Sequence, residues 1–403
     1  MRVLLLSPWL PYPVTWGFAK RVYHILEELA ARHEVTLVTY TDGDDQAAQE
    51  VLRRLCTVHV VPRPALPAGK RLAQLASTLS PRSFQHRLMY SDAMQRQLDV
   101  LTSGAAFDVL HVSTSQMACF RFDPRSPLVL DEHNIEYELY YRVFQAEGSV
   151  PRRLFNWLEY RKFRREEIAA WRAADGIAMT SRREAAFVQQ MLPGACVVSV
   201  PNAVETDYFA PAADDSAVDA EAIVMTGLMK YRPNVDGAIF FAREILPRIR
   251  QARPRATFYV VGGEPAPEVT ALAGPHVVVT GSVDDVRPYV HRSTVFVVPL
   301  RMGSGTRLKV LEGLAMGKAM VSTAIGCEGI DVVDGEHLRI ADTPEAFADA
   351  VLALMGNPAL ARTLAGNGRT LMLDRYRWKT VVPTLEALYA DATASRAGRT
   401  QPV

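Results

Sequence analysis

Cysteine is scarce in this chain, with four residues among 403, at positions 56, 119, 196 and 327. No two of them have the spacing of a C-x-x-C or zinc motif, so the sequence argues against a disulfide-stapled scaffold and a zinc module. We expect reduced thiols and therefore a cytoplasmic location. No run approaches the roughly 18 apolar residues of a membrane-spanning helix. The short apolar run at the N-terminus ends in prolines, so we interpret it as a buried strand and not as a signal peptide.

Charge of either sign is not in excess: Lys and Arg number 45, and Asp and Glu number 44. This balance gives no sign of a nucleic-acid partner. No G-x-G-x-x-G follows the first strand, which argues against a nicotinamide-dependent dehydrogenase. The segment Asp42-Gly43-Asp44-Asp45 is formally an Asp-x-Asp metal motif, but we interpret it as a solvated turn. The sequence therefore predicts neither a metal nor a cofactor.

What the chain does contain is an alternation of apolar strands and helices, in a composition typical of a globular enzyme. We expect strands at 3–7, 33–40, 58–61, 109–112, 128–130, 176–181 and 197–200, and then at 222–227, 257–261, 277–280, 295–298 and 319–322. Strands that are apolar throughout and alternate with helices form parallel sheets covered on both faces. The predicted fold is α/β, with two doubly wound, Rossmann-like domains and ligands at the carboxyl ends of the strands, between the domains.

The domain boundaries follow from changes in composition. The predicted N-terminal domain covers 1–203, a linker 204–221, and the C-terminal domain 222–375. A last helix is expected over 376–394, and a disordered tail over 395–403.

The most informative segment runs from Pro299 to Thr323 and reads as strand end, small-residue loop, short helix and strand. The loop Gly303-Ser304-Gly305-Thr306 has almost no side chain, so its N–H groups can face an anion at the positive end of the following helix. We interpret it as a diphosphate site. The alternative is an ordinary strand-to-helix turn of the kind found in many α/β proteins.

Charged residues surround the same point. Arg301, Arg307 and Lys309 supply positive charge, and Glu312 lies one turn into the helix, within reach of a ribose hydroxyl pair. For Arg307, a solvent-facing position in the first helical turn is the alternative. Together these residues predict a site for a nucleoside diphosphate.

These features resemble glycosyltransferase family 4. The resemblance rests on the two doubly wound domains, on the segment from Gly303 to Glu312, and on Pro201-Asn-Ala-Val-Glu-Thr-Asp-Tyr-Phe-Ala-Pro at the domain junction. It implies the GT-B fold and a retaining enzyme that uses a nucleotide sugar. It also implies that the N-terminal domain binds the acceptor, that the C-terminal domain binds the donor, and that the last helix crosses back onto the N-terminal domain.

The resemblance implies roles for single residues and exposes two departures. The second glutamate of the family's Glu-x7-Glu motif matches Glu312 and binds the nucleotide ribose, whereas the position of the first is Ser304. The family's diphosphate-binding arginine after the first donor-domain strand is Leu228 here. Lys230 or Arg232 are candidates to replace it, unless they lie in a solvated loop. Arg301 and Lys309 are the other candidates.

In the N-terminal domain the resemblance singles out two positions. Gly17 matches one of the two glycines in the family's loop over the donor phosphate; the alternative is a plain helix-start glycine. His133 follows an apolar strand, where the family has a histidine that contacts the donor sugar. His111, at the end of another strand, is the weaker candidate and has a structural alternative.

The expected function is a retaining transfer of a sugar from a nucleoside-diphosphate sugar to a glycan, lipid-linked or small-molecule acceptor, in polysaccharide or glycoconjugate biosynthesis. A non-hydrolysing sugar-nucleotide 2-epimerase and a non-catalytic nucleotide-sugar-binding homologue are the alternatives. Residues 151–172 are basic and carry aromatic side chains. We therefore consider two interpretations: peripheral attachment to the inner face of a membrane, or an ordinary domain helix whose apolar side faces the core.

Overall fold

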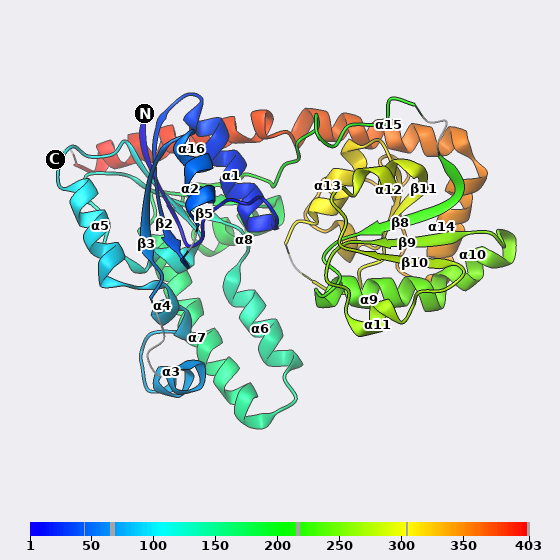
Figure 1. Ribbon diagram of the computed structural model, residues 1–403. Helices are drawn as coiled ribbons and strands as arrows, with labels where there is room; N and C mark the ends of the chain where they lie inside the picture. Colours follow the sequence, from blue (N-terminus) through cyan, green and yellow to red (C-terminus); the bar gives the residue numbers. More distant parts are fainter. Residues whose placement is uncertain (44, 65–68, 215–217, 304, 401–403) are drawn as a thin grey trace. The chain divides into compact units, whose positions relative to one another are not determined.

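The computed structural model describes residues 1–43, 45–64, 69–214, 218–303 and 305–400. The chain divides into two compact units. The N-terminal unit comprises residues 1–201 and the chain from Val381 onward, and the C-terminal unit comprises residues 202–380. Each unit is a parallel sheet with helices on both faces (Figure 1), so the predicted α/β architecture is confirmed.

Seven parallel strands form the sheet of the N-terminal unit, in the order β3-β2-β1-β4-β5-β6-β7. Their bounds are β1 Arg2–Ser7, β2 Glu34–Thr41, β3 Thr57–Pro62, β4 Val109–Ser113, β5 Leu128–Glu132, β6 Gly176–Met179 and β7 Val197–Ser199. Leu5 of β1 pairs with Leu37 on one side and with His111 on the other. The strand order reverses between β1 and β4, so their carboxyl ends form the switch point, where doubly wound sheets bind ligands.

Helices cover both faces of this sheet. They are α1 Gly17–Ala30, α2 Gln46–Arg53, α3 Gly69–Thr78, α4 Phe84–Met89, α5 Asp92–Thr102, the 3₁₀ turn η1 Ser115–Cys119, α6 Glu136–Ala146, α7 Val150–Ala173 and α8 Arg182–Met191. Helices α6 and α7 form a hairpin that extends away from the sheet (Figure 1). Because α7 buries Phe163 and Trp171, its C-terminal part packs on the core.

Six parallel strands form the sheet of the C-terminal unit, in the order β10-β9-β8-β11-β12-β13. Their bounds are β8 Asp219–Thr226, β9 Thr257–Val261, β10 Val277–Gly281, β11 Ser293–Val298, β12 Ala319–Ser322 and β13 Arg339–Ile340. The order reverses between β8 and β11. The switch point of this unit therefore lies at the carboxyl ends of those two strands.

The helices of the C-terminal unit are α9 Arg232–Phe240, α10 Leu246–Ala252, α11 Pro267–Thr270, α12 Arg287–Arg292, α13 Leu308–Ala315, α14 Pro344–Gly356 and α15 Pro358–Arg375, with the 3₁₀ turn η3 Ile325–Cys327. A π-helical turn, η2 Phe241–Ile245, joins α9 to α10. Pro247 is the second residue of α10, one position after Leu246. Proline has no backbone N–H to donate to the helix, and its ring clashes with the carbonyl group of the preceding turn. A wider, π-helical turn relieves that clash.

Three boundaries differ from the sequence-based expectation. The units separate after Pro201, and β8 begins at Asp219, inside the predicted linker. The last helix, α16, runs from Trp378 to Thr400, so residues 395–400 are helical where a disordered tail is predicted. Arg396 explains this order, because it donates to the carbonyl oxygen of Pro124 at 3.0 Å and forms an ion pair with Asp175.

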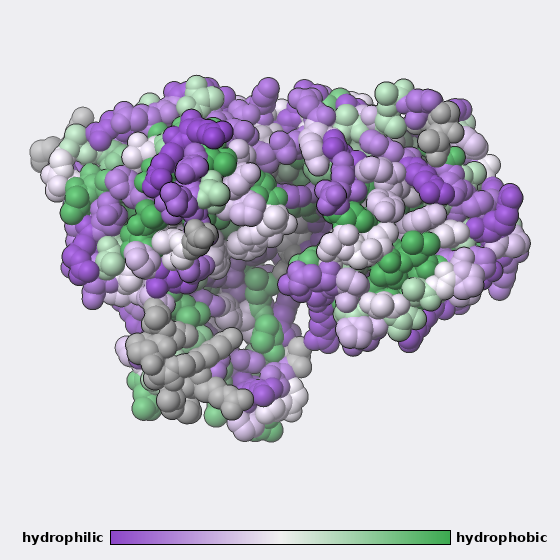
Figure 2. All heavy atoms as spheres, viewed as in Figure 1, coloured by the Kyte–Doolittle hydropathy of each residue, from purple (hydrophilic) through white to green (hydrophobic). Residues whose placement is uncertain are grey.

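The surface bears on attachment to membranes. The face in Figure 2 is largely hydrophilic, with apolar residues in small groups. Over the described ranges, no helix is at once long enough and apolar enough to span a bilayer.

Candidate functional site

The carboxyl edge of the C-terminal sheet brings two loops together. β8 ends at Thr226 and is followed by Gly227, and β11 ends at Val298 and leads through the glycine loop to α13. The two strands are neighbours at the switch point. This is the position at which doubly wound folds bind their ligands.

Lys309, the second residue of α13, reaches the first of these loops. Its Nζ donates a hydrogen bond to Oδ1 of Asn234 at 2.7 Å, and Asn234 Nδ2 donates to the carbonyl oxygen of Leu228 at 2.9 Å. A Cβ added to Gly227 would lie 2.7 Å from Lys309 Nζ and 2.7 Å from Asn234 Nδ2. The two side chains therefore use the space that only glycine at position 227 leaves open.

Burial dominates the electrostatics of Lys309. Burial lowers the pKa of Lys309 to about 7, against the attraction of Glu312, and the nearby Arg307 adds to the lowering. An opposite charge placed beside a buried amine favours its charged form. A bound anion would therefore raise this pKa and make the lysine fully cationic.

The other two cations have different surroundings. Arg301 donates from Nε and Nη2 to the carboxylate of Asp236, at 3.0 and 2.7 Å, and lies over the ring of Phe240 at 4.4 Å. Arg307 does not take the solvent-facing alternative: it is 8% exposed, and its Nη1 donates to the carbonyl oxygen of Gly305 at 2.7 Å. Of the three, Lys309 is the cation placed against Gly227.

The glycine loop has a backbone that needs its glycines. Gly303 has a φ of +127° and Gly305 a φ of +74°, a region that side-chain-bearing residues rarely adopt. A Cβ on Gly303 would lie 2.9 Å from Nη2 of Arg307, which folds back against the loop. Thr306 completes the loop before Arg307. Ser304 lies outside the described residues.

The remaining predicted donor-site residues lie around this centre. Glu312 is partly buried in α13, and its charge acts on Lys309. Lys230 forms an ion pair with Glu264 at 2.7 Å, with both side chains more than half exposed. Arg232 is the first residue of α9 and is exposed. Asn234, which sequence reasoning missed, is buried; its only signal was an amide at the start of the helix that follows the first donor-domain strand.

His133 lies at the carboxyl edge of the other sheet, directly after β5. Its ring stacks on Phe18 with centroids 4.5 Å apart and planes at 21°, and its Nε2 lies 3.5 Å from Oδ2 of Asp131. Burial lowers the pKa of His133, and the neighbouring Asp131 opposes that shift. When Nε2 carries the proton toward Asp131, Nδ1 is the basic ring nitrogen.

A buried network supports His133. Arg21 of α1 binds the carboxylate of Asp131 through Nε at 3.0 Å and Nη2 at 2.5 Å. Although burial raises the pKa of Asp131, Arg21 and His133 lower it well below its usual range. Nε2 of His111 lies 3.8 Å from Asp131, and its Nδ1 lies 2.7 Å from the hydroxyl of Tyr389 on α16. The C-terminal helix is therefore joined to His133 through buried polar groups.

This network separates the two histidines. Burial lowers the pKa of His111 to about 4, so it is neutral at physiological pH, and its hydrogen bond to Tyr389 fits the structural alternative. Sequence reasoning missed Arg21 and Asp131. The signals were an arginine on the inward face of an apolar helix and an acid at the end of an apolar strand, since buried charges need partners.

Gly17 is the first residue of α1 and is exposed. The loop before it contains Trp9 and Trp16, whose rings meet edge to face at 5.4 Å. The loop follows β1, one of the two switch-point strands. It therefore lies at the same edge of the sheet as His133.

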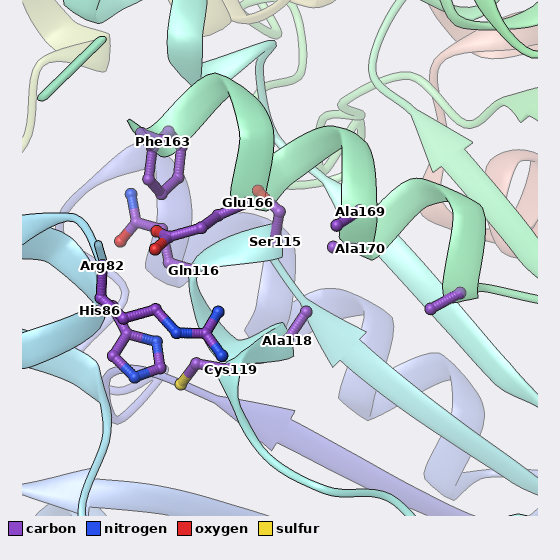
Figure 3. A pocket seen from close by; sticks show the side chains of 11 residues that line it. Arg82, His86, Ser115, Gln116, Ala118, Cys119, Phe163, Glu166, Ala169 and Ala170 are labelled. Atoms are coloured by element: carbon purple, nitrogen blue, oxygen red, sulfur yellow. The ribbon is translucent and has the colours of Figure 1, made fainter. Parts of the chain in front are cut away.

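A pocket of about 180 Å³ lies elsewhere in the N-terminal unit, lined from α4, η1 and α7 (Figure 3). Its lining includes the charged or titratable side chains of Arg82, His86 and Glu166, the polar Ser115 and Gln116, and Cys119. Burial raises the pKa of the Cys119 thiol to about 12, so it stays protonated and is a poor nucleophile. The described lining includes none of the residues predicted for the site.

Two acidic side chains of the turn after β2 form hydrogen bonds with neighbouring protein groups. Asp42 accepts from Nε of Arg63 at 2.5 Å, and Asp45 accepts from the hydroxyl of Thr41 at 2.7 Å. Asp44 lies outside the described residues. Among the residues that are described, no three histidine, cysteine or acidic side chains are grouped so that they could hold a metal ion. That neither a metal nor a cofactor is required stays a prediction.

Two family models match this chain. Residues 17–203 match the glycosyl transferase 4-like domain, and residues 220–357 match glycosyl transferases group 1. A phosphatidyl-myo-inositol mannosyltransferase of Mycobacterium tuberculosis is 24% identical over 324 residues, which cover 77% of this chain and 81% of the relative.

Solved structures agree on the fold. Sucrose-phosphate synthase from Thermosynechococcus elongatus has a TM-score of 0.70 at 20% identity, over 98% of this chain and 100% of that one. The Anabaena protein HepE in complex with UDP has a TM-score of 0.67 at 14% identity, over 97% of this chain and 100% of that one. Both likenesses cover nearly the whole chain, so they show the GT-B architecture of both units.

Proposed function

Because this chain belongs to the group 1, family 4-type glycosyltransferases of the GT-B fold, we propose that it transfers a sugar from a nucleoside-diphosphate sugar to a glycan, lipid-linked or small-molecule acceptor, with retention of anomeric configuration. The observation that carries the donor assignment is Lys309, held by Asn234 against Gly227 at the switch point of the C-terminal unit.

The proposed chemistry follows from the charge that develops on the leaving group. Cleavage of the bond from the anomeric carbon leaves negative charge on the diphosphate. Lys309 and the N–H groups at the start of α13 are fixed positive groups that oppose it, and such groups lower the barrier. We assign the ribose hydroxyls to Glu312 and the transferred sugar to His133. The departing phosphate then serves as the base for the acceptor hydroxyl.

A labelled-donor assay tests the proposal. The purified chain is incubated with UDP-, GDP- and dTDP-sugars labelled in the sugar, and transfer or slow donor hydrolysis is followed. We expect Lys309→Met to lower kcat/KM by about 100-fold, the scale of one preorganised stabilising group. The comparison variant is Lys230→Met, which removes an exposed, ion-paired lysine. A larger loss in Lys230→Met than in Lys309→Met would overturn the donor-site assignment.

The same assay separates the alternatives. A 2-epimerase converts the donor into its epimer without an acceptor, and a non-catalytic homologue binds the nucleotide and releases no labelled sugar. The family models support a transferase over both. Retention is tested separately by NMR of the product, because inversion would give the opposite anomer from that of the donor sugar.

We propose peripheral membrane attachment through the predicted segment 151–172 and, with it, the rest of the α6–α7 hairpin, which we define here as residues 136–173. Apolar side chains are exposed near its tip, with Val150 79%, Leu154 57% and Val143 55% exposed, and Arg152 and Arg153 lie between them in the sequence. Apolar groups beside basic ones suit an anionic bilayer surface. Co-sedimentation with phosphatidylglycerol vesicles that is unchanged in Val150→Asp/Leu154→Asp would refute the attachment.

All four cysteines are free thiols. Reduced thiols are typical of intracellular proteins. A cytoplasmic location is therefore proposed, and fractionation of cells that express the chain tests it.

A further inference from the structure

Trp16 is an exposed aromatic residue at the carboxyl edge of the N-terminal sheet. The residue is 46% exposed. Its ring stacks on Phe18, with centroids 5.3 Å apart and planes at 24°, and makes an edge-to-face contact with Trp9, with centroids 5.4 Å apart. Phe18 packs on one face of the indole, so a ligand that stacks on Trp16 has to use the opposite face.

The rings behind Trp16 hold it in a defined orientation. Trp9 packs against Phe18 at 5.0 Å in an edge-to-face contact. The guanidinium of Arg63 lies over the Trp9 ring at 5.8 Å, and Arg63 is itself fixed to Asp42 by an ion pair of 2.5 Å. A large aromatic side chain with few rotatable bonds gives contact area at a low entropic cost. Trp16 is therefore a preorganised surface.

The position of this surface connects it with His133. Phe18 stacks on Trp16 with one face and lies parallel to His133 at 4.5 Å, so the three rings form a continuous series. The loop carrying Trp16 follows β1, a switch-point strand. A molecule resting on Trp16 therefore lies two ring contacts from the histidine assigned to the transferred sugar.

We propose that Trp16 is a stacking platform for a sugar ring of the acceptor, which makes the acceptor a glycan or another sugar-bearing molecule. The C–H groups on one face of a pyranose carry partial positive charge and pack on the electron-rich face of an indole, while the hydroxyls at the ring edge reach polar neighbours. Polar groups lie one ring away from Trp16, because Arg63, which pairs with Asp42, lies over the ring of Trp9. A lipid chain, in contrast, needs apolar walls on several sides. This proposal rests on the proposed function, and it specifies the class of acceptor.

Saturation-transfer NMR tests the platform without relying on turnover. The probes are methyl glycosides of glucose, galactose, mannose and N-acetylglucosamine, with farnesyl phosphate as a lipid probe. We expect protein-to-sugar transfer for at least one glycoside in the wild type and in Trp16→Phe. We expect it to be roughly tenfold weaker in Trp16→Ala, the scale of one aromatic contact. Trp157→Ala, which removes an aromatic ring on α7, is the matched control and should behave as the wild type.

Each other outcome overturns the proposal. It fails if no glycoside gives a signal that depends on Trp16, or if only farnesyl phosphate does. It also fails if Trp16→Ala weakens UDP or GDP binding in calorimetry, because Trp16 then serves the donor. The proposed function fails differently, through absence of nucleotide binding by the wild type. Circular dichroism of Trp16→Ala confirms that the variant is folded.

Discussion

The pKa of Lys309 leads to a prediction about protons. Burial lowers it to about 7 in the free protein, from an ordinary value of 10.5. A diphosphate bound beside Nζ favours the ammonium form, so the pKa rises on binding. The sign follows directly. Below pH 7 the free lysine is already protonated, so binding of the diphosphate takes up few protons. Above pH 7 the lysine must gain a proton when the diphosphate binds, so the affinity for the diphosphate falls as the pH rises.

The magnitude follows from the two pKa values. With a free value of about 7 and a bound value near that of an ordinary lysine, binding at pH 8 takes up about 0.9 proton. Between pH 7 and pH 9 the dissociation constant should rise by up to about 50-fold, since a pKa unit is worth about 1.4 kcal/mol. The effect belongs to this residue alone and is separate from the titration of the nucleotide.

Calorimetry measures both quantities. Titrations with UDP and with GDP at pH 8, in HEPES and in Tris, give proton uptake from the difference in apparent enthalpy. Lys309→Arg is the control, because its charge is permanent and should remove the uptake while keeping a cation. Lys309→Met removes both. Uptake that is absent in the wild type, or unchanged in Lys309→Arg, would refute the reasoning.

Four further predictions follow from the same geometry. Glu312→Ala should weaken nucleotide affinity in calorimetry by about 1.5–3 kcal/mol with an unchanged melting temperature, the scale of a lost charged hydrogen bond; equal affinity would remove its ribose role. His133→Ala should lower turnover far more than affinity for the free nucleoside diphosphate, and full turnover would make the histidine structural. Tyr389→Phe should lower the free energy of unfolding by about 1–3 kcal/mol in urea, because buried His111 loses its partner; an unchanged midpoint would contradict this. Gly262→Ala should prevent folding or cost several kcal/mol, since a Cβ there would lie 1.8 Å from a carbonyl oxygen of the loop after β8; a normal melting temperature would show that the loop can move.

The sheets were largely predictable because buried parallel strands are apolar throughout. Every strand from β1 to β12 coincides with an apolar run in the sequence. β13 was missed because two residues, Arg339 and Ile340, are too few to show a pattern. The ordered tail was missed for another reason: its anchor is a tertiary ion pair between Arg396 and Asp175, more than 200 positions apart.

The sequence predicts where the candidate site lies, but it does not indicate which of its cations is placed to bind the diphosphate. Arg301 and Lys309 are both cations near one glycine loop, and nothing in the sequence separates them. The fold does so through α9, where Asp236 binds Arg301 and Asn234 binds Lys309. A partner on another element of the fold decides whether a cation is already paired with a carboxylate, as Arg301 is, or held by a neutral amide, as Lys309 is, and spacing along the chain does not reveal it.

The position of Lys309 suggests why this chain can have a leucine at position 228, where the family has an arginine. The resemblance places a diphosphate-binding arginine at that position, and here the carbonyl oxygen of Leu228 instead accepts from Asn234, which in turn accepts from Lys309. If Lys309 supplies the missing charge, Leu228→Arg should partly restore nucleotide affinity to Lys309→Met. The two cations would then be alternative sources of one positive charge, and their effects would be strongly non-additive. Additive effects of the two substitutions in a double-mutant cycle would mean that position 228 and Lys309 do not share a ligand group. The diphosphate would then have to be sought elsewhere along the carboxyl edge of the C-terminal sheet.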